Sequence, residues 1–276
     1  MRNPTGYYRP QTVSEAVALL MQRHITTVAL AGGALRLASE DELEFEAVVD
    51  LQDIAELSAI SETSDHRLHI GAGVSLETFV NHPACPAMLR QVIRRVVPLN
   101  RRNGISVGEL IDFQAELAEV TAALMALGTV VIMRAPDEGR VVLADWPAAT
   151  PSQGLIIGLE VPLSSSEICW GAAHVARTPA DEAIVSAAAV LVVEEGMVTE
   201  ARLALSGLWS APARLAQAGN LLHGNALDGS AIASVLDALR DEVAPVGDYL
   251  GSEAYRRAMA VVIARRALEQ CQARLG

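Results

Sequence analysis

The sequence predicts a two-domain protein built from both helices and strands, with one domain over residues 1–163 and the other over residues 164–276. Three observations lead to this prediction. The chain of 276 residues can bury a substantial core and is long enough for two modest domains. Apolar runs rich in β-branched residues alternate with helical patterns through the first domain. The segment "VPLSSSEI", residues 161–168, then precedes strands that are followed by a helical bundle.

The first part of the chain predicts a helix followed by strands. Residues 12–24 show apolar residues at helical spacing, with Thr12 or Ser14 as the N-cap. The run "TTVALAGG", residues 26–33, predicts a strand that ends in a tight loop. Further strands are expected at residues 45–54 and 66–82, the latter leading into a helix at Ser75. This order indicates a small βαβ unit near the N-terminus.

The remainder of the first domain alternates in the same way. A helix is expected over residues 83–102, and a glycine-containing turn lies within "RRNGISVGELIDF", residues 101–113. The stretch 115–133 predicts a helix that Gly128 stops, followed by the strand "TVVIM". Two more strands are predicted in "EGRVVLADW" and "GLIIGLEVP".

The second domain begins with strands. Residues 181–212 predict two strands around a Glu195-Gly196 turn, and then a third feature at Ala204 to Gly207. Three helical patterns follow from Ala211 onward, so this domain is expected to end in a helical bundle.

The composition is that of a globular protein, with 51% hydrophobic and 20% charged residues. The net charge of −12 argues against nucleic acid as a partner, because such binding depends on clustered basic side chains. All 21 positions counted as lysine or arginine are arginine, which excludes Schiff-base chemistry and lysine general bases. No apolar run reaches the length of a membrane span, and no signal peptide is visible. We therefore expect a cytoplasmic protein.

Metal and nucleophile chemistry are not indicated. Cys85, Cys169 and Cys271 lie far apart in the sequence, and the six histidines show no HxxxH or HExxH pattern. The expectation is that this chain binds no metal. No GxSxG motif occurs, so a serine nucleophile is not expected either.

Two glycine-containing turns are the candidate binding features. The first is Ala31-Gly32-Gly33, where glycine permits positive φ angles and lets N–H groups converge on an anion. The second lies in "RRNGISVGEL", where Ser106 stands between Gly104 and Gly108. Each is read equally well as an ordinary turn when it is considered alone.

The order of several stretches along the chain is a more specific signal than any single stretch. In the first domain the order is "YYRPQTVSEAVALL", "LAGG", "VVDLQDIAELSAI", "LHIGAGVSLETF" and "RRNGISVGELIDFQAELAEVTAALMALGTVVIM". The second domain contributes "DEAIVSAAAVLVVEEGMVTEARLALSGLWSAPARLAQAGNLLHG" and "GSEAYRRAMAVVIARRAL". In this order they resemble the flavoprotein (medium) subunit of molybdenum hydroxylases of the carbon monoxide dehydrogenase and xanthine dehydrogenase type. The resemblance covers essentially the whole chain.

The resemblance implies an α+β fold. Its parts are an FAD-binding domain with a small βαβ part and a larger α/β part, then a domain of three antiparallel strands and a three-helix bundle. It also implies FAD as cofactor, with the diphosphate held by backbone amides of the two glycine loops. The implied partners are a molybdenum-cofactor large subunit and a [2Fe-2S] small subunit, with a possible homodimer. The implied function is electron transfer from iron–sulfur clusters of a partner subunit to an external acceptor.

The implied cofactor residues depart from the family pattern. The first loop usually reads Ala-Gly-Gly-Thr-Asp, whereas here it reads Ala31, Gly32, Gly33, Ala34 and Leu35. The second usually reads Thr-Ile-Gly-Gly-Asn, whereas here Ser106, Val107, Gly108 and Glu109 are followed by Leu110. Family acidic residues at the adenosine end align with Ala115 and Glu119, so only the second stays acidic.

Two functions remain open from the sequence. The first is a working FAD subunit of an oxidoreductase complex, which the retained glycines favour. The alternative is a non-catalytic scaffold or regulatory paralogue that keeps the fold but has lost or weakened FAD binding. Glu109 favours the alternative, because an inward-pointing carboxylate about 5 Å from a diphosphate costs roughly 3 kcal/mol at an effective dielectric of about 20. Of the two, the sequence slightly favours an enzyme component, as the flavin subunit of an oxidoreductase complex.

Overall fold

The structure is a computed structural model that describes residues 4–22, 24–33, 45–134, 138–146, 154–163, 168–178 and 181–275. The chain forms two compact units that each combine separate stretches of sequence. The first unit contains Met1–Cys85, Val97–Phe113 and Thr129–Pro162, and the second contains Pro86–Val96, Gln114–Gly128 and Leu163–Gly276. The division of the chain into two domains after residue 163, which the sequence predicts, stays a prediction.

A small parallel sheet opens the first unit. Its strands are β1 (Gly6–Tyr8), β2 (Thr27–Leu30) and β3 (Ala47–Asp50), in the order β1-β3-β2. Helix α1 (Val13–Leu20) connects β1 to β2, and Thr12 caps it by accepting a hydrogen bond from the Glu15 amide at 3.2 Å. Strand β1 forms a βαβ unit with α1 and β2. The sequence predicted a βαβ unit near the N-terminus but not the strand β1.

A five-stranded antiparallel sheet forms the rest of the first unit, in the order β4-β5-β8-β6-β7. Its strands are β4 (Ile60–Glu62), β5 (Arg67–Gly71), β6 (Val130–Arg134), β7 (Glu138–Val142) and β8 (Leu155–Pro162). Short helices accompany it: η1 (Ala55–Ser58), α2 (Leu76–Asn81), α4 (Leu99–Gly104), α5 (Val107–Asp112) and η2 (Leu143–Asp145). Ser75 caps α2, as the sequence predicts.

The helix expected over residues 83–102 is in fact two helices. Helix α3 spans Ala87–Val96 and α4 starts at Leu99, because Pro98 adopts an extended conformation and becomes the N-cap of α4. Proline lacks the N–H that a continuous helix would use there.

A four-stranded antiparallel sheet forms the centre of the second unit, in the order β12-β11-β10-β9. Its strands are β9 (Ile168–Val175), β10 (Val185–Glu194), β11 (Met197–Ser206) and β12 (Ala213–Leu215). The predicted turn joins β10 to β11, with Glu195 at φ 50° and Gly196 at φ 81°. The third feature expected at Ala204 to Gly207 is the end of β11.

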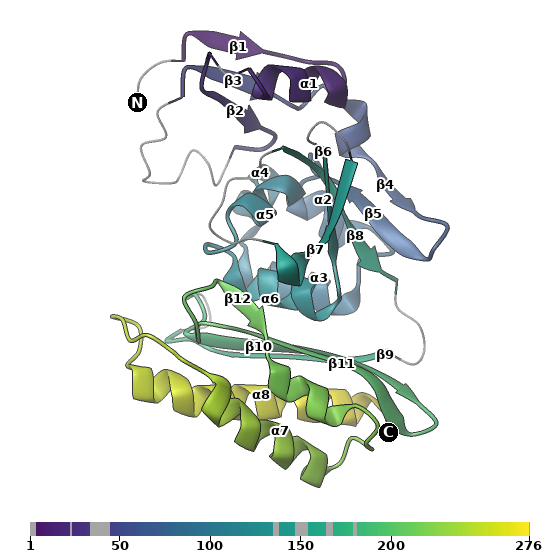
Figure 1. The fold of residues 1–276 in the computed structure, drawn as a ribbon, viewed down its shortest axis with the longest axis vertical. Coiled ribbons are helices and arrows are strands. Elements are labelled where there is room, and N and C mark those ends of the chain that lie inside the picture. The colour runs from purple at the N-terminus through teal and green to yellow at the C-terminus, as the bar shows by residue number, and fades with distance from the viewer. Residues whose placement is uncertain are drawn as a thin grey trace. The chain divides into compact units, whose positions relative to one another are not determined.

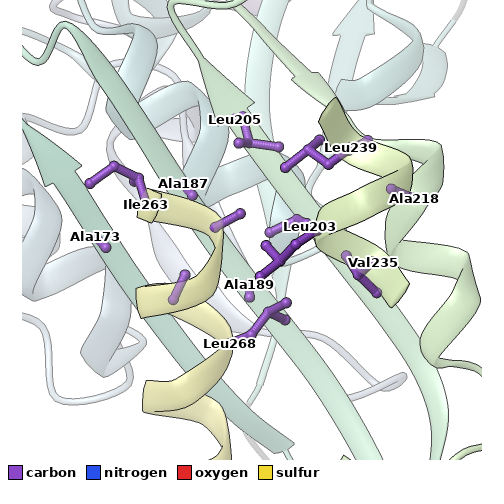
Figure 2. Close-up of a cluster of buried hydrophobic side chains, with 14 of the residues drawn as sticks. Ala173, Ala187, Ala189, Leu203, Leu205, Ala218, Val235, Leu239, Ile263 and Leu268 are labelled. Atoms are coloured by element: carbon purple, nitrogen blue, oxygen red, sulfur yellow. The ribbon is translucent and has the colours of Figure 1, made fainter. Parts of the chain in front are cut away.

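Helices cover both faces of this sheet (Figure 1). On one face lie η3 (Gln217–Leu222), α7 (Gly229–Glu242) and α8 (Glu253–Leu275), and on the other lie α3 and α6 (Ala118–Ala126). Figure 2 shows the first of these layers, where side chains of β10, β11, α7 and α8 form one buried apolar cluster that includes Ala187, Ala189, Leu205, Leu239 and Leu268. Because both faces are buried, β10 is apolar from Ala187 to Val193, without the alternation of a half-exposed strand.

Asp228 fixes the start of α7, and its loss is expected to cost about 1 kcal/mol. Its Oδ1 accepts hydrogen bonds from the amides of Ser230 at 2.9 Å and Ala231 at 2.8 Å. The variant Asp228→Ala leaves both amides without this acceptor, whereas Asp228→Ser restores a capping oxygen. Urea denaturation of both variants measures the difference, and equal stabilities of the two would contradict a capping role.

Candidate functional site

The first glycine turn follows β2 directly, and its two glycines serve different purposes. Gly33 has φ 85°, a left-handed conformation that favours glycine. Gly32 lies against the second turn: a β-carbon placed on it would lie 2.2 Å from the carbonyl oxygen of Gly104. The two turns expected to form the cofactor site are therefore in close contact. Ala34 and Leu35 lie outside the described residues.

The second turn is the start of helix α5. Ser106 is its N-cap: the hydroxyl accepts from the Glu109 amide at 3.3 Å, and Glu109 Oε2 accepts from the Ser106 amide at 3.0 Å. This reciprocal pair is a capping box, in which residues three apart satisfy each other's backbone N–H groups. The local sequence Ser-x-x-Glu thus determines the backbone of this turn.

Every backbone amide from Ser106 to Leu110 donates within the chain. The Val107 amide donates to Val74 O at 2.9 Å and the Gly108 amide to Ala72 O at 2.8 Å. The Leu110 amide donates to Ser106 O at 3.1 Å. With the capping box, these bonds engage all five N–H groups from Ser106 to Leu110, so none of these five is free to bind a phosphate.

Glu109 points into the site and not out to solvent. The residue is 5% exposed, and its Oε2 would lie 2.7 Å from a β-carbon placed on Gly32. Its carboxylate therefore lies between the two turns. This is the inward orientation in which the sequence analysis expected repulsion of a diphosphate.

A cavity of about 350 Å³ lies beside the turns within the first unit. Its walls are largely apolar and come from α1, β2 and the start of β8, with Leu20, Leu30 and Leu155 among the lining residues. Glu109 and Asp112 of α5 line the end that adjoins the turns. Among the described residues that line the cavity, none is an arginine or a histidine.

Glu119 lies in the second unit, in the first turn of α6, and forms an ion pair with Arg95 of α3. Burial raises the pKa of Glu119, and the hydrogen bond from Arg95 acts in the opposite direction. His174 lies 4.0 Å from the same carboxylate. Glu119 therefore belongs to a partly buried charge cluster of the second unit.

The residues present do not fit the diphosphate that the resemblance implies. The close contact between the two turns is kept, because Gly32 has no β-carbon to prevent it. The donors and the charge differ from those of a diphosphate site: the amides from Ser106 to Leu110 are engaged, and the carboxylate of Glu109 lies between the two turns. A carboxylate in a buried site disfavours a second negative charge nearby.

Several cavity residues were not anticipated from the sequence. Asp112 follows Glu109 by three residues, and this spacing on a helix could have marked a pair of neighbouring carboxylates. Leu20, Leu30 and Leu155 gave no such signal, because apolar residues of a cavity wall look like core residues in a sequence.

The parts of the chain that the structure describes contain no group of three or more His, Cys, Asp or Glu side chains placed to hold a metal ion. Within the same residues, no helix combines the length and apolarity needed to cross a bilayer.

Comparisons with known proteins cover nearly the whole chain. Residues 3–164 match the FAD binding domain in molybdopterin dehydrogenase, and residues 172–271 match the CO dehydrogenase flavoprotein C-terminal domain. The carbon monoxide dehydrogenase medium chain of Afipia carboxidovorans is 28% identical, over 97% of this chain and 96% of the relative. The nicotine 6-hydroxylase medium subunit of Paenarthrobacter nicotinovorans is 24% identical, over 97% of each chain. The solved structure of reconstituted CO dehydrogenase from Oligotropha carboxidovorans matches with a TM-score of 0.87 and 25% identity, covering 99% of both chains.

Proposed function

Because the chain belongs to the family of FAD-binding medium subunits of molybdenum hydroxylases, we propose that it is the medium subunit of such an assembly and holds FAD weakly. The resemblance found in the sequence is confirmed, and so is the mixed helix-and-strand fold. The inward carboxylate of Glu109 is the observation that carries the proposal of weak FAD binding. The cytoplasmic location expected from the sequence is part of the proposal.

The proposed partners are a molybdenum-cofactor large subunit and a [2Fe-2S] small subunit. The support is similarity along the full length: alignments to medium chains span 96% or more of this chain and of those relatives. A chain that needed only the FAD-binding domain would not be expected to retain the second unit as well. Its sheet, with helices on both faces, is therefore proposed to serve assembly.

A second candidate function is the flavin-dependent electron transfer of the family, to an external acceptor. The features that favour it are the cavity of about 350 Å³ and the retained Gly32, Gly33 and Gly108. When bound, FAD would supply the one- and two-electron chemistry that this role requires. The two candidates share the assembly and differ only in how tightly the chain holds the flavin.

Co-production with candidate molybdenum and iron–sulfur subunits from the same organism tests the proposal. We expect the three chains to co-elute, with flavin present well below one equivalent and lost on gel filtration, because the Glu109 carboxylate repels the diphosphate. The flavin content is measured from the visible spectrum and by acid release. One tightly held equivalent would select the second candidate, and separate elution would contradict both.

A further inference from the structure

We infer that Cys169 and Cys271 form a redox-active thiol pair, which a peroxide oxidises to a disulfide that joins strand β9 to helix α8. Both thiols are free and buried, with exposed fractions of 2% and 0%. Both cysteines belong to the second unit. The inference goes beyond the proposed function and does not depend on how tightly the chain holds FAD.

The two cysteines face each other across the contact between β9 and α8. A β-carbon on Gly171 would lie 1.9 Å from the carbonyl oxygen of Ala267, so this side of β9 is directed at α8. Cys169 precedes Gly171 by two residues and therefore points to the same side of the strand. Cys271 follows Ala267 by four residues, so it lies on the same face of the helix. Both side chains consequently belong to one buried cluster between the sheet and the helices.

Hydrogen bonds on either side of Cys271 hold the helix against the strand. Gln270 Oε1 accepts from the Ala172 amide at 3.1 Å, and Arg274 Nη1 donates to Trp170 O at 2.7 Å. The Arg274 guanidinium also stacks on the Trp170 ring, with its central carbon 3.8 Å from the ring centroid. These contacts keep the two backbones in the close approach that a disulfide requires.

The two thiols differ in how readily they ionise. The hydrogen bond with Cys271 is the main cause that lowers the pKa of Cys169, and the positive charge of Arg274 acts in the same direction, against the effect of burial. The same hydrogen bond, together with burial, raises the pKa of Cys271. Because the thiolate is the nucleophilic form of cysteine, Cys169 is the attacking thiol and Cys271 is the thiol that keeps its proton.

The oxidation proceeds in two steps. The Cys169 thiolate attacks one oxygen of hydrogen peroxide, the O–O bond breaks, and the leaving hydroxide takes up a proton to become water; Cys169 is then a sulfenic acid. The Cys271 thiol next loses its proton and attacks the sulfur of Cys169, and the S–O bond breaks to release a second water. The two thiols together lose two electrons and two protons, which reduce the peroxide to two waters.

The pair lies near the ends of both elements, where a small oxidant can gain access. Cys169 is the second residue of β9 (Ile168–Val175), which is the last strand in the sheet order β12-β11-β10-β9. Cys271 lies in the last turns of α8 (Glu253–Leu275). The ends of helices and strands open locally at a lower free energy than their centres. Peroxide therefore needs only a local opening to reach Cys169.

Peptide mapping of the full-length protein tests the inference. Trypsin cleaves after arginine and leaves Cys85, Cys169 and Cys271 in three different peptides, 68–90, 141–177 and 267–274. The folded protein is treated with hydrogen peroxide at pH 7, the remaining thiols are alkylated in urea, and the peptides are identified by mass spectrometry. We expect peptide 141–177 to be joined to peptide 267–274 with the loss of two hydrogen atoms, and dithiothreitol to separate them.

Three variants assign the roles of the residues. Cys271→Ser removes the second thiol, so Cys169 is expected to stop at the sulfenic acid, which dimedone traps. Cys169→Ser is expected to leave Cys271 unoxidised. Arg274→Met is expected to slow formation of the disulfide about threefold at pH 7 and to move the pH profile of the rate upward, because the thiolate loses a nearby positive charge. Arg265→Met, on an exposed position of the same helix, is the matched control.

The disulfide should also stabilise the protein. It would close a loop of about 100 residues, so the oxidised protein is expected to melt about 10 °C higher than the reduced protein. Circular dichroism melting measures this shift and checks that each variant is folded. A lower melting temperature after oxidation would show that the disulfide distorts the contact between β9 and α8, and would overturn the inference of a preformed pair.

Two results of the peptide mapping also overturn the inference. One is the absence of the Cys169–Cys271 linkage from the folded protein, including the case in which it forms only in urea. The other is a linkage that contains Cys85 in place of either cysteine. Oxidation of Cys271 in Cys169→Ser at the wild-type rate would contradict the role of Cys169 as the attacking thiol. An unchanged pH profile in Arg274→Met would contradict the role of Arg274.

Discussion

Replacing Arg256 by methionine is expected to lower the free energy of unfolding of the second unit by about 3 kcal/mol. Arg256 is 5% exposed and lies in the first turns of α8. Its Nη1 donates to the carbonyl oxygens of Ile184 at 2.6 Å and Gly207 at 2.9 Å, and its Nη2 pairs with Asp248 at 2.7 Å. Methionine fills much of the volume but leaves these carbonyls without their donor.

The stability lost on replacing Arg256 by methionine should be smaller at low pH than at pH 7. The hydrogen bond from Arg256 is the main cause that lowers the pKa of Asp248 below its usual 3.8, helped by the amides of Gly251 and Leu250. A carboxyl with a lowered pKa stabilises the fold above its unfolded pKa, and this stabilisation disappears as the pH falls through the folded pKa. The difference between wild type and Arg256→Met should therefore narrow below about pH 4.

Urea denaturation at pH 7 and at pH 3 measures both effects. Arg265→Met is the matched control, because Arg265 is exposed on the same helix and its loss should change stability by less than about 0.5 kcal/mol. An Arg256→Met protein as stable as this control at pH 7 would show that the buried guanidinium does not hold the two carbonyls in place.

Elements with a clear local pattern could be predicted from the sequence, whereas elements that depend on tertiary contacts could not. Apolar periodicity predicted α1, α6 and the β10–β11 hairpin, because each has enough residues to show its pattern. Strand β1 has three residues and exists through pairing with β3, which is far away in the sequence. No local pattern can report such a partner.

Strand β9 was missed for a related reason. Its Gly171 is unfavourable in a strand by propensity, yet a β-carbon there would lie 1.9 Å from the carbonyl oxygen of Ala267 in α8. The glycine is thus explained by a close approach of helix and strand. That approach is a tertiary contact, and the sequence alone does not reveal it.

The candidate site shows the same division between local and tertiary information. The Ser106-x-x-Glu109 spacing is a legible capping signal, and it could have predicted that the carboxylate turns back to the Ser106 amide. The prediction for Glu109 rested on its charge and not on this local hydrogen bond. The closeness of Gly32 on the other side could not be predicted, because it depends on where β2 ends relative to α5.

Replacing Gly32 by alanine is expected to destabilise the first unit by about 2–3 kcal/mol. The added β-carbon would lie 2.2 Å from Gly104 O, a backbone atom that cannot rotate away, and 2.7 Å from Glu109 Oε2. One of the two turns must therefore move. Thermal and urea denaturation measure the loss, with Gly229→Ala as a control, since a β-carbon there meets nothing within 4 Å.

A double variant shows which contact dominates at Gly32. If the Glu109 carboxylate were the main obstacle, Gly32→Ala with Glu109→Ala would be about as stable as Glu109→Ala alone. The shorter approach to Gly104 O remains when the side chain of Glu109 is gone, so we expect only partial recovery. Full recovery would mean that the carboxylate, and not the backbone, sets the distance between the two turns. In that case a movement of the Glu109 side chain alone would open the space between the two turns, and the backbone of both turns would stay unchanged.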